Sequence, residues 1–86
     1  MVITKELVAE KLGEYLRHEL SLAEIVDWAE TALMESEFAA RDADQLRQVV
    51  ARLGLADVQA FGLTWEDCED MLKTLGFSAH VEIVSI

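Results

Sequence analysis

The side chains that could carry chemistry are few: one cysteine, two histidines and four carboxylates close together in one short segment. Cys68 is the single candidate thiol nucleophile, and a thiol attacks only when a cationic neighbour or a helix N-terminus lowers its pKa. Its neighbours are Asp67 and Glu69, and it falls on the apolar side of a predicted helix. The adjacent carboxylates and burial both raise the pKa of a thiol, so we expect Cys68 to remain protonated. We therefore expect a buried structural cysteine and a protein that is not an enzyme.

Metal binding needs several ligands at defined spacing. The segment that begins at Asp42 and Asp44 starts like a calcium loop, but Arg47 stands where that loop needs glycine and Leu53 where it needs glutamate. The two histidines are far apart and share no ligand pattern with the single cysteine. The sequence therefore predicts no metal site and no cofactor.

The four clustered carboxylates are Glu66, Asp67, Glu69 and Asp70, in the first turns of one predicted helix. Paired carboxylates act as general acid and base only in a pocket that separates their pKa values. At about 100° per residue, these side chains point away from the apolar side of the helix and toward water. The pattern predicts a solvated helix start, and Asp67 and Asp70 become candidates for a protein-docking surface.

Composition predicts a single small acidic helical domain over residues 1–86. The 86 residues are 52% hydrophobic, and 17 Asp and Glu against 7 Lys and Arg give a net charge of −10. No apolar run approaches the roughly 18 residues of a membrane span, and the N-terminus lacks the apolar core of a secretory signal. A lone cysteine fits a reducing cytoplasm. We therefore expect a cytoplasmic protein. Because negative charge repels phosphate groups, we expect it to bind no nucleic acid and no membrane. A basic protein is the complementary partner.

The clearest element is an amphipathic helix over residues 21–35. Ser21 and Glu24 form a capping box at its start. Its outer arc carries Glu24, Asp27 and Glu30, and no Lys or Arg occurs between Arg17 and Arg41. Its inner arc is apolar, with Trp28 at the edge, and consists of Leu22, Ile25, Val26, Ala29, Ala32 and Leu33.

Three further helices are predicted from capping residues and helical spacing. They begin at Thr4, Asp42 and Thr64 and end at about residue 18, at Gly54 and at Gly76. Asp42 with Gln45, and Thr64 with Asp67, each offer a capping box. Phe77 suits the apolar contact of a Schellman-type stop after the last helix. The fold class is therefore mainly α, a compact four-helix bundle.

Three segments allow more than one interpretation. Residues 36–41 either extend the central helix or break it, and residues 55–63 form a short helical turn or a buried loop. Residues 80–86 are β-branched and predict a short C-terminal strand, with Val81, Ile83 and Ile86 as candidates for self-association. A lone strand needs a partner. The candidates are residues 2–3, residues 58–61, or the same strand of a second chain in a homodimer.

The leading functional hypothesis is a non-enzymatic module that docks a basic protein through the anionic face of residues 21–37, helped by Asp67 and Asp70, with an immunity, antitoxin or regulatory role. Met34 falls by helical angle beside the carboxylates, where an apolar anchor contributes affinity and charges steer encounter. The candidate partner-binding residues are Glu24, Asp27, Trp28, Glu30, Met34, Asp67 and Asp70.

In size, charge and helix count the chain is similar to the small acidic immunity proteins that neutralise bacterial nuclease toxins, although their tyrosine-rich recognition segment is not found here. The alternative function is a self-assembling structural subunit that dimerises through the C-terminal strand. The sequence leaves open whether Arg41, Arg47 and Arg52 neutralise the carboxylates of the central helix.

Overall fold

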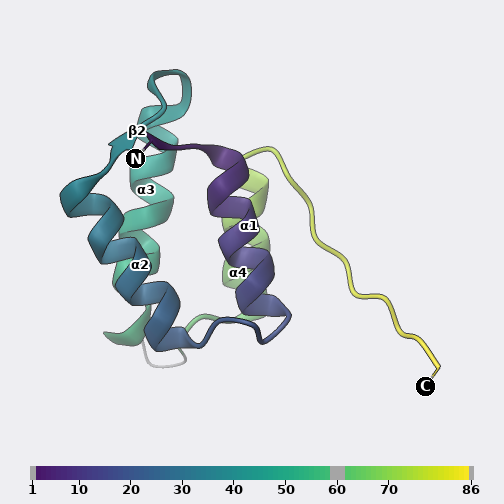
Figure 1. Ribbon diagram of the computed structural model, residues 1–86. Coiled ribbons are helices and arrows are strands. Elements are labelled where there is room, and N and C mark those ends of the chain that lie inside the picture. The colour runs from purple at the N-terminus through teal and green to yellow at the C-terminus, as the bar shows by residue number, and fades with distance from the viewer. Residues whose placement is uncertain (1, 59–61, 86) are drawn as a thin grey trace.

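Four α-helices carry the fold in the computed structural model, which describes residues 2–58 and 62–85 (Figure 1). They are α1 (Lys5–Leu16), α2 (Leu22–Glu35), α3 (Ala43–Gly54) and α4 (Trp65–Thr74). Two 3-10 turns, η1 (Ala40–Asp42) and η2 (Ala56–Val58), flank α3. The predicted mainly α fold with four helices is confirmed.

Helices α2 and α4 begin with the predicted capping boxes. At α2, the Glu24 N–H donates to the Ser21 hydroxyl at 3.1 Å, and the Ser21 N–H donates to the Glu24 carboxylate at 2.9 Å. At α4, the Asp67 N–H donates to the Thr64 hydroxyl and the Thr64 N–H donates back to Asp67, both at 3.1 Å. Each box satisfies backbone donors that the first helical turn leaves free.

The capping box predicted at Asp42 is wrong. The Asp42 side chain accepts no hydrogen bond from the first turn of α3, and its backbone (φ −121°, ψ 18°) is not extended. Ser21 and Thr64, in contrast, have ψ near 165°. Because Asp42 is the last residue of η1, it enters α3 from a turn and cannot aim its carboxylate at the N–H groups ahead of it.

The end of α4 is the predicted Schellman motif. The Phe77 N–H donates to the Leu72 carbonyl at 2.8 Å, and the Gly76 N–H donates to the Lys73 carbonyl at 3.0 Å. Gly76 has φ of 88°, a conformation that glycine adopts without strain. The chain therefore turns sharply after α4 and brings Phe77 back against the core.

Gly76→Ala is expected to lower the free energy of unfolding by about 1 kcal/mol, because a Cβ is strained at this φ. No heavy atom lies within 4 Å of that Cβ position, so the loss would report conformation and not a clash. Gly13→Ala, inside α1, is the matched control. Its Cβ would meet only the movable end of Arg17, and it should raise the free energy of unfolding by about 0.5–1 kcal/mol. Urea titration measures both, and changes of the same sign would contradict the assignment of Gly76.

The core lies where α2 packs along α3, with α1 and α4 completing the bundle (Figure 1). On α2, the predicted inner residues Ile25, Val26, Ala29 and Ala32 are buried, whereas Leu33 is exposed, contrary to prediction. Leu33 lies beside Gly54 at the end of α3, where no side chain is available to cover it. The largest fully buried side chains are Ile3, Val8, Leu12, Ile25, Leu46, Val50, Leu53, Cys68 and Met71.

A two-stranded parallel sheet joins the N-terminus to the segment after α2. Strand β1 (Val2–Ile3) pairs with β2 (Glu37–Phe38), with Val2 opposite Glu37 and Ile3 opposite Phe38. The Ala39 N–H adds a hydrogen bond to the Ile3 carbonyl at 2.9 Å. Residues 36–41 therefore break the central helix, and residues 2–3 are paired with β2 and not with the C-terminal segment.

The C-terminal segment leaves α4 as extended chain and runs away from the bundle (Figure 1). Residues 77–85 hold no helix and no paired strand, so the predicted strand is not formed within this chain. Pairing across a dimer stays a prediction. Residues 59–61 of a candidate partner segment, and Ile86 of the strand itself, lie outside the described residues.

The connection between α3 and α4 begins with η2, as the prediction of a short helical turn allows. Ala56 is buried there, while Leu55 and Val58 are exposed. The remainder of the predicted turn or loop falls partly on residues 59–61, outside the described part of the chain.

Candidate protein-interaction surface

The outer side of α2 presents two carboxylates and one large apolar side chain to solvent. Asp27, Glu30 and Met34 follow one another at helical spacing, and all three are exposed, Met34 to 83%. We call these three residues, together with Thr31 between them, the α2 face. Within residues 2–58 and 62–85, neither Asp27 nor Glu30 forms an ion pair or a side-chain hydrogen bond.

The C-terminal end of α2 adds negative charge next to Met34. Glu35 occupies the last turn and Glu37 follows in β2, both exposed, and no Lys or Arg stands in that turn. A helix C-terminus already carries negative potential, so these carboxylates strengthen a field that attracts a cation. Glu35 and Glu37 lie within the predicted anionic face of residues 21–37, but neither was named individually as a site residue. The sequence signal for them is the lack of a basic residue near the end of the helix.

Two of the predicted site residues on α2 have structural roles. The Glu24 carboxylate is held in the capping box, and its hydrogen bonds with Ser21 lower the pKa of Glu24. Trp28 is half-buried against the core, and the Lys11 ammonium lies 5.9 Å from the centre of its ring, within cation–π range. Trp28 therefore helps to join α2 to α1, and the α2 face begins beside it.

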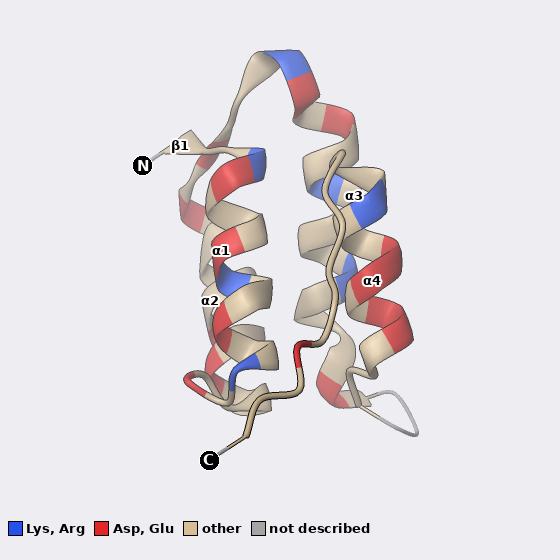
Figure 2. Cartoon of the chain, turned by 90° about the vertical axis from the view of Figure 1, so that its right-hand side faces the viewer, with Lys and Arg blue, Asp and Glu red and all other residues tan. Residues whose placement is uncertain are grey.

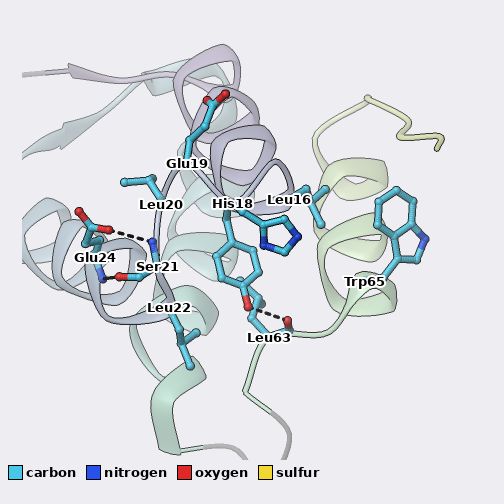
Figure 3. Close-up of a pocket in the computed structure, with 10 residues that line it drawn as sticks. Leu16, His18, Glu19, Leu20, Ser21, Leu22, Glu24, Leu63 and Trp65 are labelled. Atoms are coloured by element: carbon cyan, nitrogen blue, oxygen red, sulfur yellow. Dashed lines mark hydrogen bonds between the residues drawn. The ribbon is translucent and has the colours of Figure 1, made fainter. Parts of the chain in front are cut away.

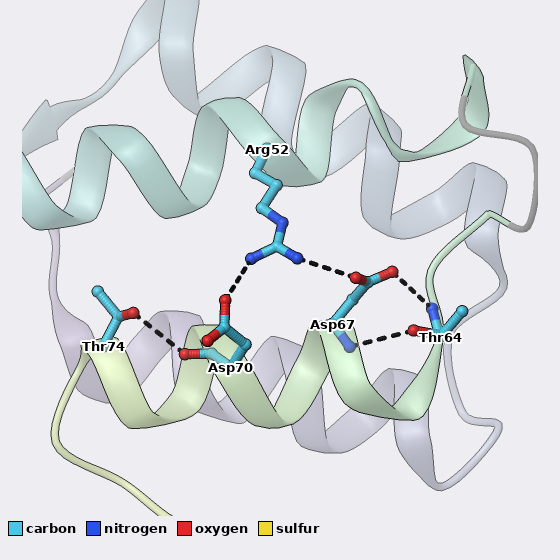
Figure 4. Close-up of polar contacts among 5 residues, drawn as sticks. All are labelled: Arg52, Thr64, Asp67, Asp70 and Thr74. Carbon is cyan, nitrogen blue, oxygen red and sulfur yellow. Dashed lines mark hydrogen bonds and ion pairs between the residues drawn. The ribbon is translucent and has the colours of Figure 1, made fainter.

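The other two predicted site residues, Asp67 and Asp70 on α4, form ion pairs with Arg52 on α3 (Figure 4). The guanidinium contacts Asp67 at 2.9 Å and Asp70 at 2.8 Å, and the pKa of Arg52 is raised, first by its hydrogen bond to Asp70. These two carboxylates therefore share one positive charge within the chain. They also lie on the opposite side of the bundle from α2 (Figure 1), so the structure does not bring the seven predicted residues into one surface.

The arginines of the middle segment do not neutralise α2. Arg52 is directed to α4, and the Arg47 guanidinium lies 5.6 Å from the centre of the Phe38 ring. In the described parts of the chain, no Lys or Arg lies within ion-pair distance of Asp27 or Glu30. The α2 face is therefore an unbalanced anionic surface.

Asp67→Asn is expected to lower the free energy of unfolding at neutral pH by about 1 kcal/mol, because it weakens the cap and removes a partly screened charge from Arg52. Hydrogen bonds from Thr64, and then the charge of Arg52, lower the pKa of Asp67. A carboxyl with a lowered pKa stabilises the fold above its unfolded pKa, about 3.9, and loses that stabilisation as pH falls through its folded pKa. Wild-type stability should therefore fall more steeply than that of the variant below about pH 4.

Thermal unfolding at several pH values tests this dependence on Asp67. Asp27→Asn is the control, since it removes the same charge from a side chain that has no polar partner in the described structure. Equal pH profiles for the two variants would contradict the role of Asp67.

A pocket at the turn between α1 and α2 is lined by Tyr15, Ser21 and His18, which bring two hydroxyls and one imidazole to it (Figure 3). The Tyr15 hydroxyl donates to the Leu63 carbonyl at 3.1 Å, and burial raises the pKa of Tyr15. The Ser21 hydroxyl points toward Glu24, on the side away from His18 (Figure 3). One lone pair of the hydroxyl is therefore used by the cap, and no hydrogen bond between described residues links Ser21 to His18 as nucleophile and base.

Cys68 is fully buried, as predicted. Burial, and next the charge of Asp67, raise the pKa of its thiol to about 11. The thiol is therefore protonated at neutral pH and is a poor nucleophile. Over residues 2–58 and 62–85, no three side chains of His, Cys, Asp or Glu gather as a metal site.

None of the helices in the described structure is both long enough and apolar enough to cross a membrane. Comparison of the chain with models of protein families, with curated proteins and with solved structures gives no match.

Proposed function

We propose that this protein is a non-enzymatic acidic interaction module that docks a basic protein partner through the α2 face. One observation carries the proposal: Asp27 and Glu30 stand beside the exposed Met34, with no counter-ion for either carboxylate in the described structure. On α4, in contrast, Asp67 and Asp70 are paired with Arg52, and Glu69 lies 3.9 Å from the Lys73 ammonium.

The partner's surface is defined by the chemistry of this face. It carries Lys or Arg groups spaced to meet Asp27 and Glu30, and an apolar depression that accepts Met34. Methionine suits such a contact because its flexible, polarisable side chain adapts to the surface that it meets. The negative end of α2, with Glu35 and Glu37, supplies a further site for a cationic side chain.

A net charge of −10 on so small a body also accelerates encounter with a basic partner. The module would cover a basic surface of its partner, as an immunity protein, an antitoxin or a regulatory subunit does. A reduced, buried Cys68 suits a cytoplasmic setting for this role.

Capture from a native lysate tests the proposal. Tagged wild-type protein and the Asp27→Lys/Glu30→Lys variant are used as baits at low and high salt, and the eluted proteins are identified by mass spectrometry. We expect a basic protein that the wild type retains at low salt, that high salt releases, and that the variant does not retain. A partner retained equally by both baits would overturn the assignment of the α2 face.

A further inference from the structure

The extended segment after α4 has the pattern of a one-sided strand. Alternate residues from Phe77 are apolar (Phe77, Ala79, Val81, Ile83), and the first two are half-buried against the core while Ser78 and His80 between them are exposed. Val81 and Ile83 continue this apolar side beyond the bundle, exposed to 69% and 94%. Period-two alternation of this kind is typical of a strand with one covered face.

The backbone of this segment is equally unpartnered. The Phe77 N–H donates the last hydrogen bond of the segment, and residues 78–85 neither donate nor accept one within the described chain. An unpaired strand edge is a template for another strand. A two-stranded ribbon alone is only marginally stable, so its apolar side must also be covered.

A groove for that apolar side lies next to the segment. It runs between α1 and α4, is lined by Leu16, Trp65 and Leu72, and continues along Ala79 and Val81. Figure 2 shows the segment passing in front of the space between these helices. Val81 lines the end of this groove and remains largely exposed, and Ile83 lies beyond the residues that line it.

We propose that this segment pairs antiparallel with the same segment of a second copy, about a two-fold axis at Val81, so that Ile83 of each copy covers the α1–α4 groove of the other. Residues opposite each other in an antiparallel pair lie on the same face, so a two-fold axis perpendicular to the ribbon must pass through a pair of identical residues. The possible registers are therefore centred on single residues.

Charge and the apolar pattern select Val81. Centring on Glu82 would oppose two carboxylates, which is destabilising. Centring on Ile83 would place Ile83 opposite itself, beyond both grooves. Centring on Val81 places Glu82 opposite His80 and Ile83 opposite Ala79, and Ala79 already lies against the bundle.

The expected dimer depends on concentration and becomes stronger as salt rises, because each copy carries a charge of −10. Salt should weaken docking of a basic partner to the α2 face, so this proposal and the proposed function can fail separately. Sedimentation equilibrium of the full chain at two salt concentrations measures the dimer. A monomer at all concentrations would overturn the proposal.

Val81→Glu and Val84→Glu are a matched pair for this measurement. Both valines are about equally exposed, at 69% and 67%, and both variants add one negative charge. Val81→Glu opposes two carboxylates at the axis and should weaken the dimer about 100-fold or more. Val84→Glu lies on the other face of the ribbon and should weaken it less than about threefold. Equal effects would overturn the register.

Cysteine cross-linking reads the register directly. In Val81→Cys the two thiols meet at the axis and should form a disulfide between copies under mild oxidation by copper–phenanthroline and oxygen. In Ile83→Cys they are separated by about 13 Å and should not. The native Cys68 is buried and does not compete. A disulfide in Ile83→Cys but not in Val81→Cys would overturn the proposed axis.

Discussion

Leu53→Ala is expected to lower the free energy of unfolding by about 3 kcal/mol, a large share of the roughly 5–15 kcal/mol that stabilises a typical domain. Leu53 is fully buried on α3, at the interface with α2 that forms the centre of the core. Truncation removes buried methyl groups and leaves a cavity that the surrounding helices fill only in part. Urea titration of the purified variant measures the loss.

Leu55→Ala is the matched control, two residues along the same segment. Leu55 is 57% exposed at the end of α3, so its truncation should cost less than about 1 kcal/mol. Equal losses at the two positions would contradict the burial of α3 against α2.

Asp27→Lys/Glu30→Lys is expected to weaken binding of the captured basic partner about 50- to 100-fold at low salt. Each reversal replaces an attraction by a repulsion, and about 1 kcal/mol or slightly more per position is typical of charged groups at the rim of an interface. The fold should be unaffected, because both side chains are exposed on a helix and lysine is a good helix former. Titration calorimetry with the purified partner measures the change in dissociation constant.

Glu6→Lys/Glu10→Lys provides the control for net charge. Both residues are exposed on α1, and the pair changes the charge of the protein by the same amount as the reversal on α2. Its effect on the dissociation constant should be less than about fivefold at low salt, through the long-range field alone. If this variant weakened binding as much as the reversal on α2, total charge and not the α2 face would explain the interaction.

Local sequence patterns predicted the helices well because their signals act over a few residues. The capping boxes at Ser21 and Thr64 and the stop at Gly76 each depend on hydrogen bonds within one turn. Asp42 is also a favourable capping residue, but the turn that precedes it decides its backbone conformation. A cap therefore follows from the sequence only where the chain before it is extended.

Contacts between distant segments could not be predicted in this way. One example is the pairing of β1 with β2, and another is the pair of ion pairs that Arg52 forms with Asp67 and Asp70. Both depend on which segments become neighbours in the folded chain. From the sequence, Arg41, Arg47 and Arg52 are possible counter-charges for α2. In the structure, Arg52 instead forms its ion pairs with Asp67 and Asp70 on α4. Asp27 and Glu30 therefore have no ion-pair partner in the described chain. Tertiary contacts thus remove Asp67 and Asp70 from the candidate site and leave the α2 face.

In the C-terminal segment, apolar residues alternate with polar ones from a point before the predicted strand at residues 80–86. The strand was predicted from the β-branched residues after His80. The alternation of apolar and polar residues, however, starts at Phe77, directly after the turn at Gly76. Phe77 and Ala79, the first two apolar residues of this alternation, are partly buried against the core. Whether a strand forms there depends on a second chain, which no local pattern can supply.

The most direct test of the proposed function is to map backbone amide shifts by NMR while the captured basic partner is added to isotope-labelled protein. The proposal predicts the largest shifts at Asp27, Glu30, Thr31 and Met34, with smaller ones toward Glu35 and Glu37. Shifts concentrated on α4 or on residues 78–85, with α2 unchanged, would contradict docking through the α2 face.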